Sequence, residues 1–332
     1  MRLSFGFMLL LGALAARVDA AELKIASLAP EGSSWMQVMR QAAETIKTKT
    51  EGRVILKFYG GGVMGNDKKV LRKIRVGQLD GSTFTPSGLA EVYPNVNVYG
   101  LPLLFQSLDE VDRVRAVEDG QMRAGLNDAG FVSFGFAEGG FAKLMSNVPV
   151  RRLDDLKGRK IWVPEGDRIS YAAMQALGLA PVTLPLTDVL TGLQTGLIDI
   201  VATSAVGALV LQWHTKVKYV TDLPLEYIVA TLAIARPSFE KLTPPDQAAV
   251  REVMDDVYKR LDHDNRAENQ KAEAALLSYG IQSVTPDAGQ LQEWRRIVGE
   301  ANRKEGQAGA FDLAVLDRIE SQLQTLRASG TH

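Results

Sequence analysis

The chain has 332 residues, of which 46% are hydrophobic and 23% charged, and its formal net charge is −1. This composition is typical of a globular protein long enough for two domains, and the balanced charge gives no reason to expect a nucleic-acid partner. Cysteine does not occur, which excludes disulfides, a thiol nucleophile, a cysteine-ligated metal and a lipid-anchored cysteine.

The N-terminal segment has the pattern of a secretory signal. Arg2 precedes an apolar run over residues 3–16, and Val18 and Ala20 fit the small-residue pattern before a cleavage site. The run is short for a bilayer span. We therefore expect residues 1–20 to be a cleaved signal peptide and the mature protein to be free in the periplasm. A retained membrane anchor is the alternative.

Alternating strands and helices follow the signal. The first helix has apolar residues at helical spacing, and either Ser33 or Ser34 fits as its N-cap. We expect strand, helix, strand, helix and strand over residues 22–28, 34–50, 54–59, 67–76 and 79–85. This order is typical of a parallel sheet with crossover helices.

A second unit with the same alternation lies further along the chain. We expect strand, helix, strand, helix and strand over residues 160–163, 169–177, 181–184, 186–196 and 197–202. Ligands of such sheets bind beyond the carboxyl ends of the strands. Each unit is therefore expected to supply one side of a cleft.

Extended segments join the two units, and helices complete the chain. Strand-like runs are expected over residues 131–137, 143–146 and 227–236. The last of them returns to the first sheet, and two extended segments that pass between two lobes form a hinge. Further helices are expected over residues 244–279, 287–305 and 310–327. We expect these helices to wrap both lobes.

Seven short motifs along the chain resemble one known family. They are LKIASLAP (23–30), GGGVMGND (60–67), VGQLDG (76–81), LPLLF (101–105), LDDLKGRKIWVP (153–164), LQTGLID (193–199) and KYVTD (218–222). Their order and spacing are similar to those of the DctP-like solute-binding subunits of TRAP (tripartite ATP-independent periplasmic) transporters.

The resemblance implies an α/β, two-lobed periplasmic-binding-protein fold with hinge strands and long C-terminal helices. Lobe I would comprise residues 21–140 and about 226–332, and lobe II about 141–225. Members of this family bind a small solute between the lobes and deliver it to integral membrane subunits, without catalysis and without a cofactor. A ligand-sensing ectodomain would use the same cleft and is the alternative.

One position departs from the family pattern. Most members have an arginine after the sequence KGxKI, where the guanidinium pairs with a carboxylate of the solute. Here that residue is Trp162, and residues 200–204 are largely apolar. Burying a carboxylate without its cation is costly. We therefore expect an apolar, amphipathic or otherwise uncharged solute, with a carboxylate held by Arg168 as the alternative.

The residues at this departure are also similar to those of one subgroup of the family. Together with residues 165–167 and 211–213, they resemble the members found with tetratricopeptide-repeat partners, for which a hydrophobic ligand has been proposed. This resemblance implies a tetratricopeptide-repeat periplasmic protein as a further partner.

Twelve residues are candidates for contact with the ligand. They are Trp162, Trp213, Trp35, Ser27, Phe84, Thr85, Gly139, Phe141, Glu165, Arg168, Tyr171 and Thr203. The aromatic members offer large, rigid apolar faces, and packing in the core is the alternative for them. For Ser27 the alternative is capping of the first helix, for Gly139 backbone freedom, and for Glu165 and Arg168 a solvated loop.

Enzymatic alternatives find little support in the sequence. Gly60, Gly62 and Gly65 match the dinucleotide fingerprint, but they follow the second strand of their unit, whereas the fingerprint follows the first. No G-x-S-x-G motif occurs, and His214 and His263 have no metal-like spacing. We therefore expect a binding protein and not an enzyme.

Overall fold

The structure is a computed structural model that describes residues 20–330. The predicted signal peptide over residues 1–20 lies outside the described residues except for its last position. Within residues 20–330, no helix combines the length and the apolar character that a membrane crossing requires.

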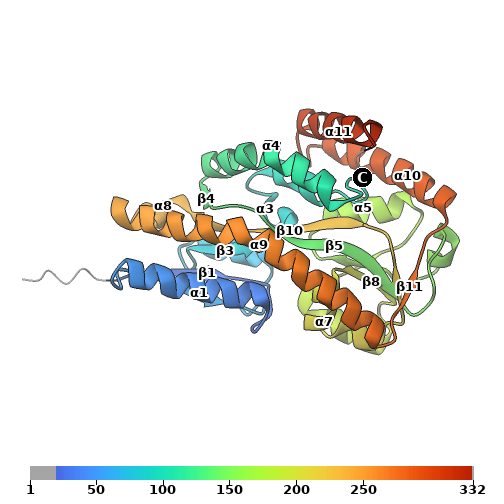
Figure 1. Cartoon of the computed structure of the whole chain (residues 1–332), viewed down its shortest axis with the longest axis horizontal. Coiled ribbons are helices and arrows are strands. Elements are labelled where there is room, and N and C mark those ends of the chain that lie inside the picture. Colours follow the sequence, from blue (N-terminus) through green and yellow to red (C-terminus); the bar gives the residue numbers. More distant parts are fainter. Residues whose placement is uncertain (1–19, 331–332) are drawn as a thin grey trace, which may run out of the picture.

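Strands and helices alternate along the chain as the sequence predicts (Figure 1). The strands are β1 (Ala21–Ala26), β2 (Val54–Tyr59), β3 (Gly81–Phe84), β4 (Phe131–Ser133), β5 (Ala137–Ser146), β6 (Trp162–Pro164), β7 (Val182–Leu184), β8 (Ile200–Thr203), β9 (Tyr219–Thr221), β10 (Glu226–Ala235) and β11 (Gln282–Val284).

The α-helices are α1 (Ser34–Lys49), α2 (Asp67–Arg75), α3 (Pro86–Leu89), α4 (Leu108–Asp128), α5 (Arg168–Ala176), α6 (Val189–Thr195), α7 (Ala205–Val210), α8 (Arg236–Phe239), α9 (Pro244–Ser278), α10 (Ala288–Gln307) and α11 (Leu313–Ala328). The 3-10 helices are η1 (Pro94–Gly100), η2 (Leu153–Leu156), η3 (Leu186–Asp188) and η4 (Trp213–Lys216).

One mixed sheet extends through the molecule in the order β11-β9-β5-β10-β3-β1-β2, with β4 paired to β10 and β8 paired to β5. β1 and β2 are parallel, with Ala21 opposite Val54 and Ala26 opposite Tyr59. β6 and β7 form a separate parallel pair, and an isolated bridge between Ile161 and Ile200 links this pair to β8. We call β1 to β4 with their helices the first half, and β6 to β9 with β11 the second half.

Two ten-residue strands connect the halves. β10 pairs with β3 and β4 through residues 231–235 and with β5 through residues 226–230. β5 in turn pairs with β8 and β9 through residues 143–146. β10 therefore has one end in the first half, β5 has one end in the second half, and together they form the predicted hinge strands. The register between β5 and β10 shifts between Ile228 and Val229.

The helix α1 forms for the reasons that its sequence indicates. Ser33 is the N-cap, and its Oγ accepts a hydrogen bond from the Met36 backbone N–H at 3.4 Å. Met36, Met39 and Ile46 recur at helical spacing and are fully buried against β1 and β2. One helix face thus covers the sheet of the first half.

The 35-residue helix α9 packs on both halves (Figure 1). Its N-terminal part buries Val250, Met254 and Leu261 in the core with β1 and β2. Its C-terminal part buries Ala272 and Leu276 in the core that contains β8 and α7. α10 contacts α5, and α11 contacts α4, so the long C-terminal helices cover both halves as predicted.

One long helix was missing from the predicted elements. α4 begins after the N-cap Ser107, and its buried face mixes Val111 and Val114 with Arg115 and Glu118. Because charged residues occupy core positions, the apolar periodicity that indicates a helix is weak there.

Arg115 fastens α4 to the hinge and to α9. Its Nη1 donates to Tyr227 Oη on β10 at 3.0 Å and to Asp262 Oδ2 on α9 at 2.7 Å. Its Nη2 donates to Asp119 and to the carbonyl of Phe136, just before β5. Arg115 is 8% exposed, and its guanidinium joins four partners from α4, α9, β10 and the segment before β5.

We expect Arg115→Met to lower the free energy of unfolding by about 3–5 kcal/mol, because it leaves Asp262 without its cation in a partly buried position. Urea unfolding followed by circular dichroism measures this change. The matched control is Arg113→Met, an exposed arginine on the same helix, for which a change within about 0.5 kcal/mol is expected. Equal effects of the two substitutions would contradict the role assigned to Arg115.

Candidate functional site

A cavity of about 1000 Å³ lies between the two halves. Its walls come from the segments that follow β1, β3, β6 and β8, from the start of α2, and from β5 and β10. These segments follow the carboxyl ends of strands, which is where ligands bind in sheets of this kind. Both halves therefore contribute to one cavity next to the hinge strands.

Two tryptophans form an aromatic wall on the side of the second half. Trp162 and Trp213 meet edge to face, with ring centroids 5.1 Å apart and an interplanar angle of 82°. Trp162 Nε1 donates to the carbonyl of Leu184 at 3.0 Å, so its polar group is already bonded. The tryptophans are 6% and 1% exposed, and both line the cavity.

Eight of the twelve candidate residues line the cavity. They are Trp162, Trp213, Trp35, Phe84, Thr85, Gly139, Glu165 and Thr203. A Cβ at Gly139 would lie 2.8 Å from Ile228 Cγ2, so the close packing of β5 on β10 requires a glycine there. Glu165 accepts a hydrogen bond from Asn66 Nδ2 at 2.9 Å.

The other four candidates do not line the cavity, and each has another contact. Ser27 Oγ accepts from Thr83 Oγ1 at 2.6 Å and from the Ala29 backbone N–H at 3.1 Å. Phe141 packs edge-on against Tyr227 with centroids 5.8 Å apart.

Arg168 and Tyr171 belong to α5 but lie away from the cavity lining. The Arg168 side chain is 62% exposed, and its Nε donates to Glu305 Oε2 on α10 at 2.7 Å. Tyr171 packs against the core beneath α5. The arginine that the sequence offers as an alternative clamp is therefore paired outside the cavity.

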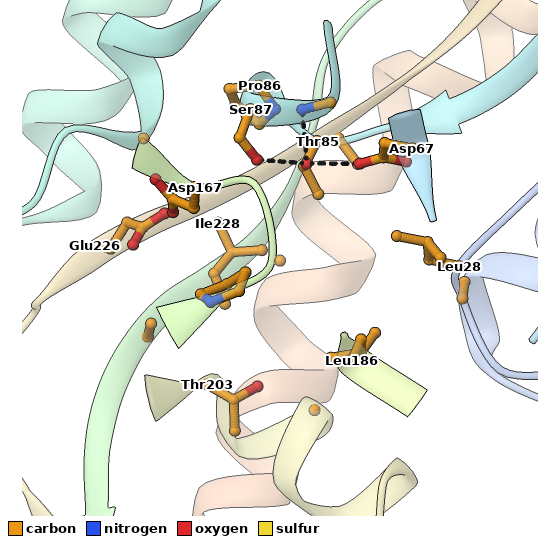
Figure 2. Close-up of a pocket in the computed structure, with 18 of the residues that line it drawn as sticks. Leu28, Asp67, Thr85, Pro86, Ser87, Asp167, Leu186, Thr203, Glu226 and Ile228 are labelled. Carbon is orange, nitrogen blue, oxygen red and sulfur yellow. Dashed lines mark hydrogen bonds between the residues drawn. The ribbon is translucent and has the colours of Figure 1, made fainter. Parts of the chain in front are cut away.

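Seven carboxylates outside the twelve candidates line the cavity, and Figure 2 labels three of them, Asp67, Asp167 and Glu226. Asp67 is the first residue of α2, and its Oδ2 accepts from Thr85 Oγ1 at 3.2 Å. Its Oδ1 is buried and has no hydrogen-bond partner among residues 20–330. Burial raises the pKa of Asp67 to about 7. A Cβ at Gly88 would collide with this carboxylate, so the glycine makes room for it.

Asp167 and Glu226 form a second acidic group, shown side by side in Figure 2. Asp167 is the N-cap of α5, and its Oδ1 accepts from the Ser170 backbone N–H at 3.0 Å. Ser170 Oγ donates to Glu226 Oε2 at 3.2 Å. Burial raises the pKa of both carboxyl groups, and the charge of Asp167 raises that of Glu226 further.

The charges that line the cavity are unbalanced. Among the described residues that line it, the basic side chains are Lys68 and Lys69, which are exposed on α2. The acidic ones are Asp67, Glu91, Glu138, Glu165, Asp167, Asp188, Glu226 and Glu268. No arginine of residues 20–330 lines the cavity. Acidic side chains therefore outnumber basic ones in the lining, which disfavours an anionic occupant.

The halves also meet at the rim of the cavity. Asn66 on the first half donates to Glu165 on the second. Nearby, a Cβ at Gly62 would lie 3.3 Å from Thr187 Cγ2, so these two segments are in contact. The rim is closed at this point. Within the described part of the chain, no group of three histidine or acidic side chains could hold a metal ion.

Comparison with known proteins relates the whole arrangement to one family. The family model for bacterial extracellular solute-binding proteins, family 7, matches residues 25–307. An uncharacterized protein, YiiZ, of Salmonella typhimurium is 29% identical over 214 residues, which are 62% of this chain and 64% of that protein. A solute-binding protein of Roseobacter denitrificans is 25% identical over 94% of this chain and 91% of its own length.

A solved structure has the same fold. It is a TRAP periplasmic solute-binding protein of Pseudomonas putida F1 with bound D-glucuronate, and it matches with a TM-score of 0.81 at 24% identity. The match covers 90% of this chain and 96% of that one. The predicted two-lobed fold is confirmed by this likeness.

We expect Asp67→Asn to stabilise the protein at pH 8 by about 1–4 kcal/mol, at about 1.36 kcal/mol per unit of pKa difference between the folded and unfolded states. The raised pKa means that the folded state holds the proton more tightly. Stability therefore falls as pH rises from the ordinary value of 3.8 to about 7, and the substitution removes this loss.

Thermal unfolding of both proteins at pH 4.5 and pH 8 measures the effect, which should be small at the lower pH. Asp109→Asn, an exposed acid in the first turn of α4, is the control and should change stability by less than about 1 kcal/mol at either pH. A destabilised Asp67→Asn variant at pH 8 would show that the carboxylate is needed in its charged form.

Proposed function

The chain belongs to the bacterial extracellular solute-binding proteins of family 7, and on that premise we propose that it is the periplasmic receptor of a TRAP transporter. It captures a small solute in the cavity between its halves and delivers the solute to integral membrane subunits. The fold and family are those of transport proteins and not of enzymes. In this proposal residues 21–140 and about 226–332 form lobe I, and about 141–225 form lobe II.

The cavity that both halves line next to β5 and β10 is the observation that carries this proposal. A solute held there contacts both halves at once, and only a closed arrangement collects all of these contacts. Solute binding therefore favours closure about the hinge strands, and the closed form is what the membrane subunits would recognise.

In this proposal the solute is apolar or amphipathic, or is uncharged, and it carries no carboxylate. Trp162 occupies the position at which the family resemblance leads one to expect an arginine, and its indole is fixed against Trp213. The Pseudomonas putida relative binds D-glucuronate, an acid. An acid in the present cavity would be buried among carboxylates without a guanidinium, at a cost of several kcal/mol.

The alternative clamp by Arg168 is the weaker hypothesis. The Arg168 side chain on α5 would have to break its 2.7 Å ion pair with Glu305 on α10 and rotate into the cavity. The tetratricopeptide-repeat partner remains a proposal that rests on sequence resemblance at residues 165–167 and 211–213.

The test is to isolate the protein from the periplasm of its native host, denature it and identify the solute that it releases. An amphipathic solute without a carboxylate, bound in a 1:1 ratio and released unchanged, is the expected result. A stoichiometric uronate or dicarboxylate would overturn the proposed solute class, and a solute converted during incubation would overturn the receptor function.

We expect Trp162→Ala to weaken binding of this released solute by about 10- to 100-fold, because a buried aromatic contact contributes about 1.5–3 kcal/mol. Isothermal titration calorimetry on the variant measures the dissociation constant. Tyr171→Ala is the matched control, since it truncates an aromatic side chain of the second half that does not line the cavity. The assignment of Trp162 to the ligand wall fails when both variants bind with the affinity of the unmodified protein.

A further inference from the structure

We infer that the solute carries a basic nitrogen, protonated when bound, and that Asp167 and Glu226 form the subsite that receives it. This inference rests on the proposed receptor function and specifies the class of solute. The solute would then be an amphipathic amine, with an apolar body and a cationic head.

The two carboxylates form a hydrogen-bond acceptor site in which one oxygen has no donor. Ser170 holds both groups, through its backbone N–H to Asp167 and through its hydroxyl to Glu226 Oε2. Glu226 Oε1 accepts no hydrogen bond from any residue in the range 20–330, and Glu226 lines the cavity. A donor-rich head group can bond to this oxygen without displacing a protein contact.

Neither carboxylate has a cation within ion-pair distance among residues 20–330, although the four most deeply buried acids of that range are paired with arginines. Those pairs are Glu110 with Arg327, Glu118 with Arg318, Glu138 with Arg266 and Asp246 with Arg53. A close pair of desolvated acids without a cation is unfavourable in the empty protein. The arrangement becomes favourable when a bound cation supplies the missing charge, and such arrangements occur at functional sites.

A third carboxylate gives independent support. Asp67 comes from α2 in the first half, lines the same cavity, and has a buried oxygen without a hydrogen-bond partner in the described chain. In Figure 2, Thr85 lies between Asp67 and the pair formed by Asp167 and Glu226. Carboxylates from both halves thus line the cavity, so a cationic solute bound between them would bridge the halves and favour closure.

A hydroxyl head group fits these observations less well than an amine. A hydroxyl can donate one hydrogen bond, but it brings no charge to offset two adjacent carboxylates. A protonated amine brings two or three donors and a full positive charge. Leu28, Leu186 and Ile228 surround the neighbouring space in Figure 2 and provide apolar contacts for the rest of the solute.

The first experiment compares small ligands that share one apolar group and differ only in the polar head group. Thermal shifts of the full mature protein are measured with three matched series: tryptamine, tryptophol and indole-3-acetate; 2-phenylethylamine, 2-phenylethanol and phenylacetate; hexylamine, hexanol and hexanoate. The released native solute is analysed in parallel for a basic nitrogen. Stabilisation by amines above the alcohols and acids, and a basic nitrogen in the released solute, are the expected results.

The outcomes separate the two proposals. If alcohols or acids stabilise the protein and the amines do not, the amine subsite is overturned and the receptor function stays intact. A released solute that lacks a basic nitrogen has the same consequence. If no compound stabilises the protein and no solute is released, both proposals are overturned.

The second experiment tests the subsite itself with the amine that gives the largest shift. Asp167→Asn and Glu226→Gln should each weaken its binding by about 10-fold or more, because each removes one charge that the ammonium group contacts. Asparagine still caps α5, and unfolding of the empty variants checks that they fold.

Asp109→Asn is the control, because it removes one negative charge from an exposed position of α4 outside the cavity lining. Its affinity for the amine should stay within about twofold of the unmodified protein, since exposed charges are screened. A loss of affinity equal to that of Glu226→Gln would indicate a general effect of net charge and would overturn the assigned subsite.

Discussion

The antiparallel pairing of β5 with β10 is the constraint on which the rest of the structure depends. Each strand continues from this shared ladder into pairing within one half of the molecule. A slip of one residue would turn every side chain to the opposite face of the sheet, so the halves cannot slide past one another. Relative motion is limited to bending and twisting along the pair. The register shift between Ile228 and Val229 interrupts the ladder beside the cavity, where irregular pairing bends strands.

Helices and buried charges then limit how freely the pair can bend. α9 contributes side chains to the cores of both halves, and Arg115 ties α4, α9 and β10 together around Tyr227. Asp167 and Glu226, which line the cavity, have no cation within ion-pair distance among residues 20–330. The described chain therefore pairs its most deeply buried acids with arginines and leaves Asp167 and Glu226 without a cation.

The sequence predicts the elements well where apolar spacing and caps agree. The range 54–59 coincides with β2, and Ser33 is the cap of α1. α4 was missed because Arg115 and Glu118 interrupt its apolar face. Positions in the site were harder to predict, because they depend on contacts between distant segments.

The two tryptophans of the wall are 51 positions apart, and only the fold brings their rings together. The direction of the Arg168 side chain depends on Glu305, which lies in another helix. Asp67, Asp167 and Glu226 come from three separate elements, so no local pattern could indicate that they line one cavity.

The rim bond from Asn66 to Glu165 has a consequence for selectivity. One exposed hydrogen bond contributes about 0.5–1.5 kcal/mol, too little to lock an empty receptor shut. Vacant receptors therefore divide between open and shut forms, and the shut fraction scales the apparent affinity for every solute alike.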